Sequence, residues 1–325
     1  MATPDSIAAV IIGRNEGARF LACLDSLPTD LSPVIYVDSG SSDGSIEAAK
    51  AAGAMVVSLE SGKPFTAARA RNAGLARLDP TVTGFVQFID GDCTLRDGWI
   101  RRAVEALRAE PDLAVVCGRR RERQPEASIY NRLCDREWDT PVGPALACGG
   151  DAMMRLAPLC AVGGFRDGLI AGEEPELCLR LRRAGWRIER LDAEMTWHDA
   201  AMTRFGQWWQ RSRRAGHAFA EGTALHGASP ERHWVRETRR ALFWGAVLPL
   251  GIAVLLATAP ALGMVGLLAY PAQVLRLAVR RGGRGKSSWE QAFFTVLGKF
   301  PEAQGALGYR LASLRGQRRE LIEYK

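Results

Sequence analysis

Two closely spaced aspartates, Asp90 and Asp92, follow directly after the apolar run of residues 85–89. Carboxylates are rarely buried in proteins unless they are paired or bind a metal. At the end of a buried strand they can hold a hard divalent cation, and the cation can hold a diphosphate. The alternative interpretation is a simple turn, because Asp-Gly is common turn chemistry. The elements around the two aspartates favour one interpretation over the other.

Strands and helices alternate on both sides of this motif. We expect strands over residues 7–12, 34–37, 54–58, 84–89 and 113–117, and helices over residues 16–27, 44–52, 65–78 and 99–109. This alternation predicts a mainly parallel sheet with helices on both faces. Ligands of such sheets bind beyond the carboxyl ends of the strands. Asp38 and Asp90 each end a predicted strand, so both are expected at one rim, which favours the metal site.

The chain beyond residue 118 is less regular. Residues 119–144 combine poor periodicity with high charge density, which predicts a loop-rich stretch that is able to close over a site. A helix is expected over residues 177–184 and a strand-like run over residues 186–197.

The composition changes at Ala241, since Arg276 is the only charged residue between there and Ala278. A membrane span needs about 20 apolar residues. We expect two tight spans, residues 241–256 and 262–279, or a re-entrant pair that does not fully cross; a soluble core pair is the least favoured interpretation. Basic residues flank the run on both sides, which places both ends in the cytoplasm by the positive-inside rule. They are Arg236, Arg239 and Arg240 before it, and Arg280, Arg281, Arg284 and Lys286 after it.

Bulk composition limits the possible partners. The net charge of +7 is compatible with nucleic acid, an anionic membrane surface or a phosphorylated small molecule. The seven cysteines form no CxxC pair, so neither a disulfide framework nor a zinc site is indicated. Reduced and mostly buried thiols in a cytosolic domain are expected.

Six short motifs occur in a fixed order along the chain. They are residues 11–16 (IIGRNE), 37–44 (VDSGSSDG), 70–74 (ARNAG), 90–92 (DGD), 149–153 (GGDAM) and 172–180 (GEEPELCLR). Together they resemble the motifs of family 2 glycosyltransferases of the GT-A fold, over roughly residues 7–200. The resemblance implies an α/β fold with a Rossmann-like, mixed but mainly parallel sheet, followed by a C-terminal helical membrane-associated region.

The same resemblance and the composition suggest four regions. Residues 1–203 would form the GT-A catalytic domain and residues 204–240 a basic and aromatic interfacial helical linker. Residues 241–279 would form the hydrophobic hairpin, and residues 280–325 a basic amphipathic helical tail on the membrane or packed on the catalytic domain.

The resemblance implies that a nucleotide-diphosphate sugar, most readily a UDP-sugar, lies across the rim. Asp38 would contact the base, although a turn or helix-capping aspartate is the alternative. Asn15 and Glu16 would line the base or ribose pocket, although Glu16 also suits the first turn of a helix. Arg71 would face the nucleotide, and Asp90 would meet the ribose.

A metal site is implied next to this pocket. Asp92 would bind Mn²⁺ or Mg²⁺, which bridges the two phosphates of the donor. His198 matches a histidine that completes the metal site in many relatives, although a lone histidine is more often structural. An imidazole ligand favours Mn²⁺ over Mg²⁺.

Glu173 and Glu174 form a second carboxylate pair. Acidic residues at a helix N-terminus also complement the helix dipole, which is the alternative role. The resemblance places the catalytic base here, where it removes the proton of an acceptor hydroxyl as the hydroxyl attacks the anomeric carbon. We predict Glu174 as the base, with Glu173 as its neighbour and alternate. The commoner family pair is Glu-Asp, so the choice between the two glutamates stays open.

Acceptor contacts are implied at two further places. Gly150 and Asp151 would shape the acceptor side, with Asp151 contacting the donor sugar or the acceptor. The segment 207–214 resembles the Gln/Arg/Trp patch of processive relatives, in a different order. Trp208 and Trp209 would stack on a sugar, and Arg211 would bind the diphosphate of a lipid carrier. A basic helix lying on anionic lipid is the alternative.

These features predict an inverting, metal-dependent glycosyltransferase at the cytoplasmic face of the inner membrane. Its acceptor would be a lipid-linked or growing glycan, in cell-surface polysaccharide or glycolipid synthesis. A polyprenyl-phosphate glycosyltransferase is the nearest alternative. A basic nucleic-acid-binding or membrane-binding protein without enzymatic activity is a different class, but no recognised nucleic-acid-binding motif is present, so no nucleic-acid partner is expected.

Overall fold

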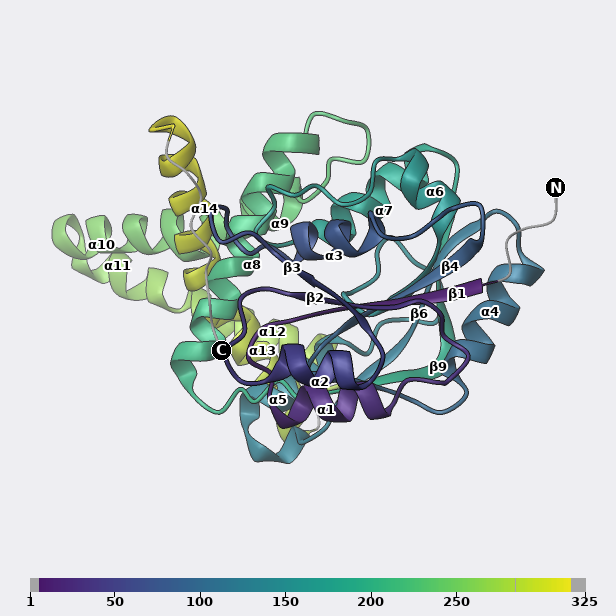
Figure 1. Ribbon diagram of the computed structural model, residues 1–325. Coiled ribbons are helices and arrows are strands. Elements are labelled where there is room, and N and C mark those ends of the chain that lie inside the picture. The colour runs from purple at the N-terminus through teal and green to yellow at the C-terminus, as the bar shows by residue number, and fades with distance from the viewer. Residues whose placement is uncertain (1–5, 284, 317–325) are drawn as a thin grey trace. The chain divides into compact units, whose positions relative to one another are not determined.

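The computed structural model describes residues 6–283 and 285–316. The described chain divides after Thr203 into two compact units. The first unit is built on one nine-stranded sheet in the order β3-β2-β1-β4-β8-β6-β9-β5, with β7 paired to β9 (Figure 1). Its strands are β1 (Ser6–Gly13), β2 (Val34–Asp38), β3 (Met55–Ser58), β4 (Thr83–Asp90), β5 (Cys93–Leu95), β6 (Leu113–Glu122), β7 (Gly143–Pro144), β8 (Ala152–Arg155) and β9 (Arg187–His198).

Helices cover both faces of this sheet. Figure 1 shows α1 (Ala18–Asp25) and α2 (Ser45–Ala51) on one face, and α3 (Ala67–Leu75), α6 (Leu156–Ala161) and α7 (Glu173–Arg183) on the other. The remaining helices of this unit are α4 (Trp99–Ala109), the short η1 (Pro125–Ala127) and α5 (Ile129–Glu137). The central strands are apolar because both of their faces lie under helices, and Val10, Ile11 and Phe88 are fully buried.

The strand directions bring the acidic motifs to one rim. β1 runs parallel to β2 and to β4, with Gly13 opposite Asp38 and Ile12 opposite Asp90. β8 runs antiparallel to β4 and β6, and β6 runs parallel to β9. The predicted mixed, mainly parallel α/β sheet is therefore confirmed.

Several local predictions were wrong. The stretch 119–144 is not mainly loop, because β6 continues to Glu122 and α5 follows, with the Ser128 hydroxyl accepting the Asn131 amide at its start. Only two residues of α5, Asn131 and Cys134, are buried, so the helix leaves little apolar periodicity in the sequence. The short strands β5 and β8 were not predicted, and α7 begins at Glu173 rather than at Leu177.

The second unit is helical. It contains α8 (Phe205–His226), α9 (Val235–Leu242), the π-helical turn η2 (Phe243–Val247), α10 (Leu248–Thr258), α11 (Pro260–Leu267), α12 (Ala269–Arg280), α13 (Lys286–Leu297) and α14 (Lys299–Leu314). Val235–Thr258 and Pro260–Arg280 are two helices that are long and apolar enough to cross a membrane. Within the described part of the predicted basic tail, two helices meet at Gly298; Arg284 and residues 317–325 lie outside the described residues.

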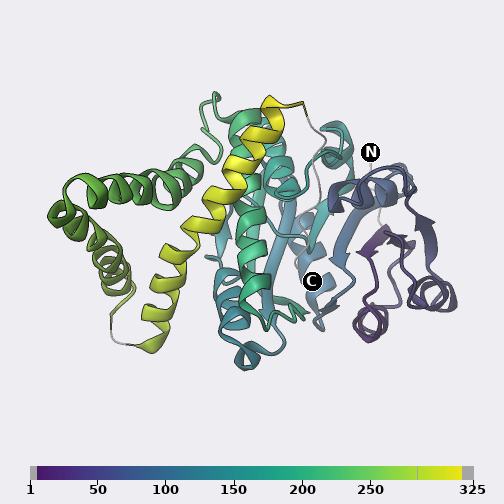
Figure 2. The same ribbon diagram turned by 90° about the vertical axis from the view of Figure 1, so that its left-hand side faces the viewer.

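Glycines allow α8 and α14 to pack backbone against backbone (Figure 2). A Cβ atom added at Gly216 would lie 1.9 Å from the carbonyl oxygen of Glu302, and one added at Gly305 would lie 1.9 Å from that of Arg213. The contact is therefore tight from both sides, and side chains larger than glycine are excluded at both positions.

Candidate active site

Arg71 joins the two acidic motifs. Its guanidinium lies 2.8 Å from Asp90 Oδ1, and its Nη1 lies 2.9 Å from Glu173 Oε1 and from Glu174 Oε1. Arg71 is only 2% exposed, so these charges meet in a poorly solvated place, where ion pairs are strong and unpaired charges are costly. The carboxylate that ends β4 and the pair that opens α7 thus form one cluster around one arginine.

Asp90 is held from its other side by Arg120. Arg120 Nη2 lies 3.1 Å from Asp90 Oδ2 and 2.8 Å from Asp151 Oδ2. Asp151 also accepts hydrogen bonds from the Asp90 amide at 3.0 Å and from the Thr196 hydroxyl at 2.8 Å. Because Asp151 is fully buried and its carboxylate is saturated by these partners, it holds Asp90 and Arg120 in place in this structure. The predicted contact of Asp151 with the donor sugar or the acceptor stays a prediction.

Gly150 permits the close approach of these charges. A Cβ atom at this position would lie 2.6 Å from Arg71 Nη2 and 2.7 Å from Asp90 Oδ2. A side chain here would push the Arg71–Asp90 pair apart. The structure therefore places Gly150 behind the acidic cluster, and its predicted contact with the acceptor stays a prediction.

Glu174 has the protonation behaviour of a general base. Burial and the neighbouring Glu173 charge raise the pKa of the Glu174 carboxyl to about 7, against the opposing effect of Arg71. A base is most effective when its pKa lies near the working pH. The Glu174 side chain keeps 13% of its surface exposed, whereas the Glu173 side chain keeps 5%, so Glu174 is the more accessible of the two.

Asp92 and His198 meet at the same rim. The β5–β9 pairing sets Cys93 opposite His198, and this register brings Asp92 Oδ2 to 3.3 Å from His198 Nε2. Cys93 Sγ lies within the same group of atoms that could hold a metal ion. Burial raises the pKa of the Cys93 thiol well above its ordinary value when no metal is bound.

The surroundings of His198 keep its imidazole neutral and oriented. Burial lowers the pKa of His198 below its ordinary value, although the nearby Glu122 carboxylate acts in the opposite direction. Glu122 Oε2 lies 3.8 Å from His198 Nδ1, and the Trp138 ring packs edge-on against the imidazole at 4.7 Å between centroids. A neutral imidazole beside a carboxylate is a donor set that suits a divalent metal. Asp92 and His198 therefore fit the predicted metal site.

The residues predicted to bind the base and ribose lie at the loops after β1 and β2. Asp38 is 1% exposed and accepts hydrogen bonds from the backbone amides of Gly40 and Ser41, so it has the geometry of the turn aspartate that was the alternative. Asn15 joins the two loops, because its side-chain oxygen accepts the Ser42 amide at 2.7 Å. Glu16 pairs with Arg19 one turn along the chain, at 2.7 Å.

Trp208, Trp209 and Arg211 belong to α8 in the second unit. Trp208 is buried and packs against the ring of Phe294, at 5.0 Å between centroids, and its predicted stacking on a sugar stays a prediction. The Trp209 indole donates to Gln304 Oε1 at 3.0 Å, which ties α8 to α14. The Arg211 side chain stays partly exposed.

Sequence reasoning missed three residues that build the site: Arg120, Glu122 and Trp138. Two of them lie on the end of β6, inside the stretch that was expected to be loop. Alternation was the signal that could have found them, since a strand continued past Cys117 would have pointed Arg120 and Glu122 to one face.

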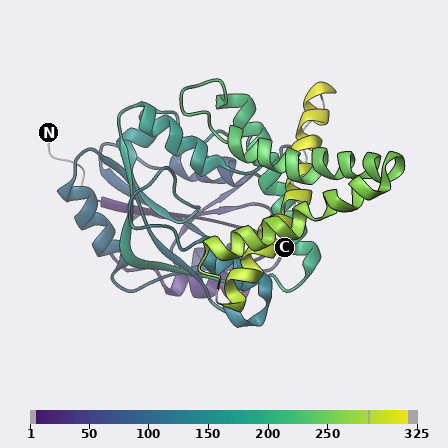
Figure 3. The ribbon, with the colours of Figure 1, turned by 180° about the vertical axis from the view of Figure 1, so that it is seen from behind.

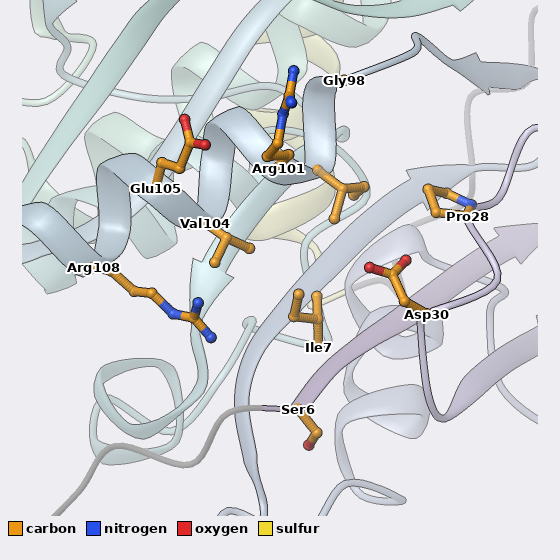
Figure 4. Close-up of a pocket in the computed structure, with 10 residues that line it drawn as sticks. Ser6, Ile7, Pro28, Asp30, Gly98, Arg101, Val104, Glu105 and Arg108 are labelled. Carbon is orange, nitrogen blue, oxygen red and sulfur yellow. The ribbon is translucent and has the colours of Figure 1, made fainter.

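A separate cavity of about 640 Å³ lies at the other end of β1 (Figure 4). It is lined by Ser6 and Ile7, which begin that strand, together with Pro28, Asp30, Gly98, Ile100, Arg101, Val104, Glu105 and Arg108. The cavity lies at the amino end of β1, whereas the acidic cluster lies at the carboxyl ends of the parallel strands. None of the residues that line the cavity belongs to the acidic cluster.

The sheet order and the rim of carboxylates are those of a GT-A fold. The family model described as glycosyl transferase family 2 matches residues 8–145. This match supports the predicted family and the predicted transferase class.

Two curated relatives and one solved structure are similar over longer stretches. The pre-mycofactocin glycosyltransferase of Mycobacterium tuberculosis is 28% identical over 257 residues, which cover 76% of this chain and 51% of that protein. The succinoglycan biosynthesis protein ExoA of Rhizobium meliloti is 30% identical over 206 residues, which cover 58% of this chain and 62% of that protein. The chain thus spans about half the length of the first of these relatives.

The solved structure is the mannosyltransferase PcManGT from Pyrobaculum calidifontis in complex with GDP-Man and Mn²⁺. The match has a TM-score of 0.65 at 19% identity and covers 94% of this chain and 89% of that one. At this identity the likeness supports the fold.

Proposed function

We propose that the protein is an inverting, metal-dependent glycosyltransferase that moves a sugar from a nucleotide-diphosphate donor to a lipid-linked or growing glycan. One observation carries the proposal: Arg71 binds Asp90, Glu173 and Glu174 together, beside the rim where Asp92 meets His198. A site with an accessible carboxylate near a metal-binding pair has the parts that sugar transfer from a diphosphate requires.

Asp92 and His198 would hold Mn²⁺ or Mg²⁺. When bound, this ion neutralises the charge that develops on the leaving diphosphate. Asp90, fixed between Arg71 and Arg120, would accept hydrogen bonds from the ribose. The match to the family model supports a nucleotide-diphosphate donor, and the complex of PcManGT with GDP-Man and Mn²⁺ makes guanosine donors worth testing beside the predicted UDP-sugars.

Glu174 would act as the general base. Its carboxylate takes the proton of the acceptor hydroxyl while the hydroxyl oxygen attacks the anomeric carbon and the bond to the nucleoside diphosphate breaks on the opposite side. One displacement of this kind inverts the anomeric configuration. The raised pKa of about 7 and the partial exposure of Glu174 support this role over a purely structural one.

The apolar helices of the second unit support a membrane location, and a curated relative supports the class of acceptor. Two apolar helices support attachment to a membrane, and the basic residues at both ends of the apolar run support a catalytic unit on the cytoplasmic side. The similarity to a succinoglycan biosynthesis protein supports an acceptor in polysaccharide assembly. Product analysis with polyprenyl phosphate and with a polyprenyl-diphosphate sugar separates the two acceptor classes.

A donor screen tests the proposal. The full chain in detergent is incubated with UDP- and GDP-sugars, with Mn²⁺ or with a chelator, and the released nucleoside diphosphate is measured. We expect release from at least one donor, dependent on the metal and abolished in Asp92→Ala. The matched control is Asp97→Ala, because Asp97 is exposed and lies outside the cluster. Unchanged release of the nucleoside diphosphate by Asp92→Ala, or by the wild type in chelator, would contradict a role for the metal.

A further inference from the structure

We propose that the hairpin formed by α10 and α11 enters only one leaflet of the membrane and turns back inside the hydrocarbon core. The two helices project together from the second unit (Figure 3). The inference rests on the proposed membrane attachment and is independent of the chemistry at the acidic cluster. In this arrangement the hairpin does not cross the membrane. Both of its ends lie on the same side of the membrane as the catalytic unit.

Contacts within the second unit hold the base of the hairpin outside the membrane. A Cβ atom added at Gly245 would lie 1.9 Å from the Lys299 carbonyl oxygen, so η2 touches the backbone at the start of α14. Tyr270 stacks on Phe300 at 5.6 Å between centroids, and its hydroxyl donates to the Trp244 carbonyl oxygen at 2.9 Å. Both legs are therefore fixed to α14 at their bases.

An ion pair marks the level at which the membrane can begin. Lys299, which touches Gly245, pairs with Glu302 one turn along α14. Charged groups are costly in hydrocarbon, so this level lies at or above the headgroups. From Gly245 to the turn at Thr258 the helix rises about 20 Å. The hydrocarbon core is about 30 Å thick, so the first leg ends before it can reach the far side.

The part beyond this level is apolar on all sides. Ile252 is the buried residue of α10 and Gly263 the buried residue of α11, where the two helices face each other. Outward residues are well exposed, with Leu250 at 67%, Leu262 at 61% and Val265 at 64%. Such a surface is unfavourable in water and suits contact with acyl chains.

The turn at residues 258–260 carries no charged side chain. The Thr258 hydroxyl donates to the Val254 carbonyl oxygen at 2.9 Å, and the Ala259 amide donates to the Leu255 carbonyl oxygen at 2.7 Å. A turn that reached the far headgroups would gain from charged or polar side chains. This turn instead lacks charged side chains and bonds its one hydroxyl within α10, which favours a place inside hydrocarbon.

Positive charge collects at the other end of the hairpin. Exposed arginines occur in α9, before the apolar run, and around the end of α12, after it. They are Arg236, Arg239, Arg240, Arg276, Arg280 and Arg281. Anionic headgroups of a single leaflet would attract them. The charged residues that flank the hairpin therefore indicate contact with one membrane surface, at the end opposite the turn.

Cysteine labelling in sealed membrane vesicles of both orientations tests the depth. The native cysteines lie in the first unit, and Cys160 is exposed, so it reports the face of the catalytic unit. Ala261→Cys places a thiol next to the turn, and Gly285→Cys, in open space at the base, is the matched control. A thiol in hydrocarbon does not ionise and therefore does not react with a membrane-impermeant maleimide.

We expect Gly285→Cys to react from the same face as Cys160, and Ala261→Cys to react from neither face until detergent is added. Reaction of Ala261→Cys from the opposite face would show a full crossing and overturn the inference. Reaction from the Cys160 face without detergent would show that the hairpin lies outside the hydrocarbon. Recovery of the protein in the soluble fraction would overturn the membrane attachment itself.

A matched pair of charge insertions gives a second readout. Leu262→Arg puts a charge at the turn and Leu275→Arg puts one beside Arg276 at the base, and both leucines are exposed. In a re-entrant hairpin the membrane-bound fraction should fall on the order of tenfold or more for Leu262→Arg and little for Leu275→Arg. In a crossing hairpin the turn faces water, so equal retention of the two variants would contradict the inference.

Discussion

Glu174 differs from the other carboxylates of the cluster because it combines partial exposure with a raised pKa of about 7. A general base works only in its ionised form, so kcat/KM should rise as the pH increases and level off above the pKa. We predict an acidic limb with a midpoint near pH 7 in the profile of sugar transfer. A rate independent of pH between 5 and 9, at saturating metal, would remove Glu174 from this role.

The neighbour of Glu174 should move that midpoint. The Glu173 charge raises the pKa of Glu174, so Glu173→Gln removes a repulsion and lowers this pKa. We predict that the acidic limb shifts to lower pH by about one unit while transfer persists. An inactive Glu173→Gln variant with normal donor binding would instead make Glu173 the base.

Arg71 is the buried centre of the acidic cluster. Arg71→Met leaves three carboxylates without their common partner, so we predict a loss of about 3–5 kcal/mol in the free energy of unfolding together with a loss of transfer. Arg77→Met, at an exposed position shortly after α3, is the control and should change neither. Denaturation monitored by fluorescence, in detergent, measures the difference; equal stability of the two variants would contradict a central role for Arg71.

At the scale of elements, the α8–α14 contact depends on glycine. Gly305→Ala would press a methyl group against the Arg213 carbonyl oxygen, so we predict a loss of about 1–3 kcal/mol. Gly308 lies on the same helix with nothing within 4 Å of an added Cβ atom, so Gly308→Ala should stabilise the helix by about 0.5–1 kcal/mol. Opposite shifts in the midpoint of thermal unfolding are expected, and shifts of the same sign would contradict the packing.

The elements also show what sequence patterns can and cannot predict. The long buried strands and the helices after them were predictable, because an apolar run such as Phe85–Ile89 leaves a signal that does not depend on distant residues. The strand β5 and the helix α5 were not, since three residues and a mostly polar helix carry too little periodicity. Their pairings with β9 and β6 depend on residues far away in the chain.

Some contacts of the candidate site were predictable from the sequence and others were not. The family resemblance predicted that Asp92 and His198 belong to one metal site, and the β5–β9 register brings their side chains to 3.3 Å from each other. The pairing of Arg120 with Asp90 and Asp151 could not be predicted, because it depends on how far β6 extends. The burial of Trp208 against Phe294 could not be predicted either, because α8 and α13 are distant in sequence.

At the scale of the whole molecule, an apolar run whose only charged residue is Arg276 separates two basic segments. We predict that the full chain stays with the membrane fraction through high-salt and carbonate washes and is released by detergent, because apolar burial rather than charge attraction retains it. Fractionation of cells that express the protein measures this. Release by salt alone would reduce the attachment to surface electrostatics.

The most direct test of the proposed chemistry compares Glu174→Gln with the wild type in two parallel measurements, donor affinity and transfer rate, on the same detergent-solubilised samples. Glutamine keeps the size of the side chain but cannot accept the proton. We predict a donor Kd within a few-fold of the wild type and a transfer rate lower by roughly 10²–10⁴-fold. A transfer rate near that of the wild type would contradict the assignment of Glu174 as the base.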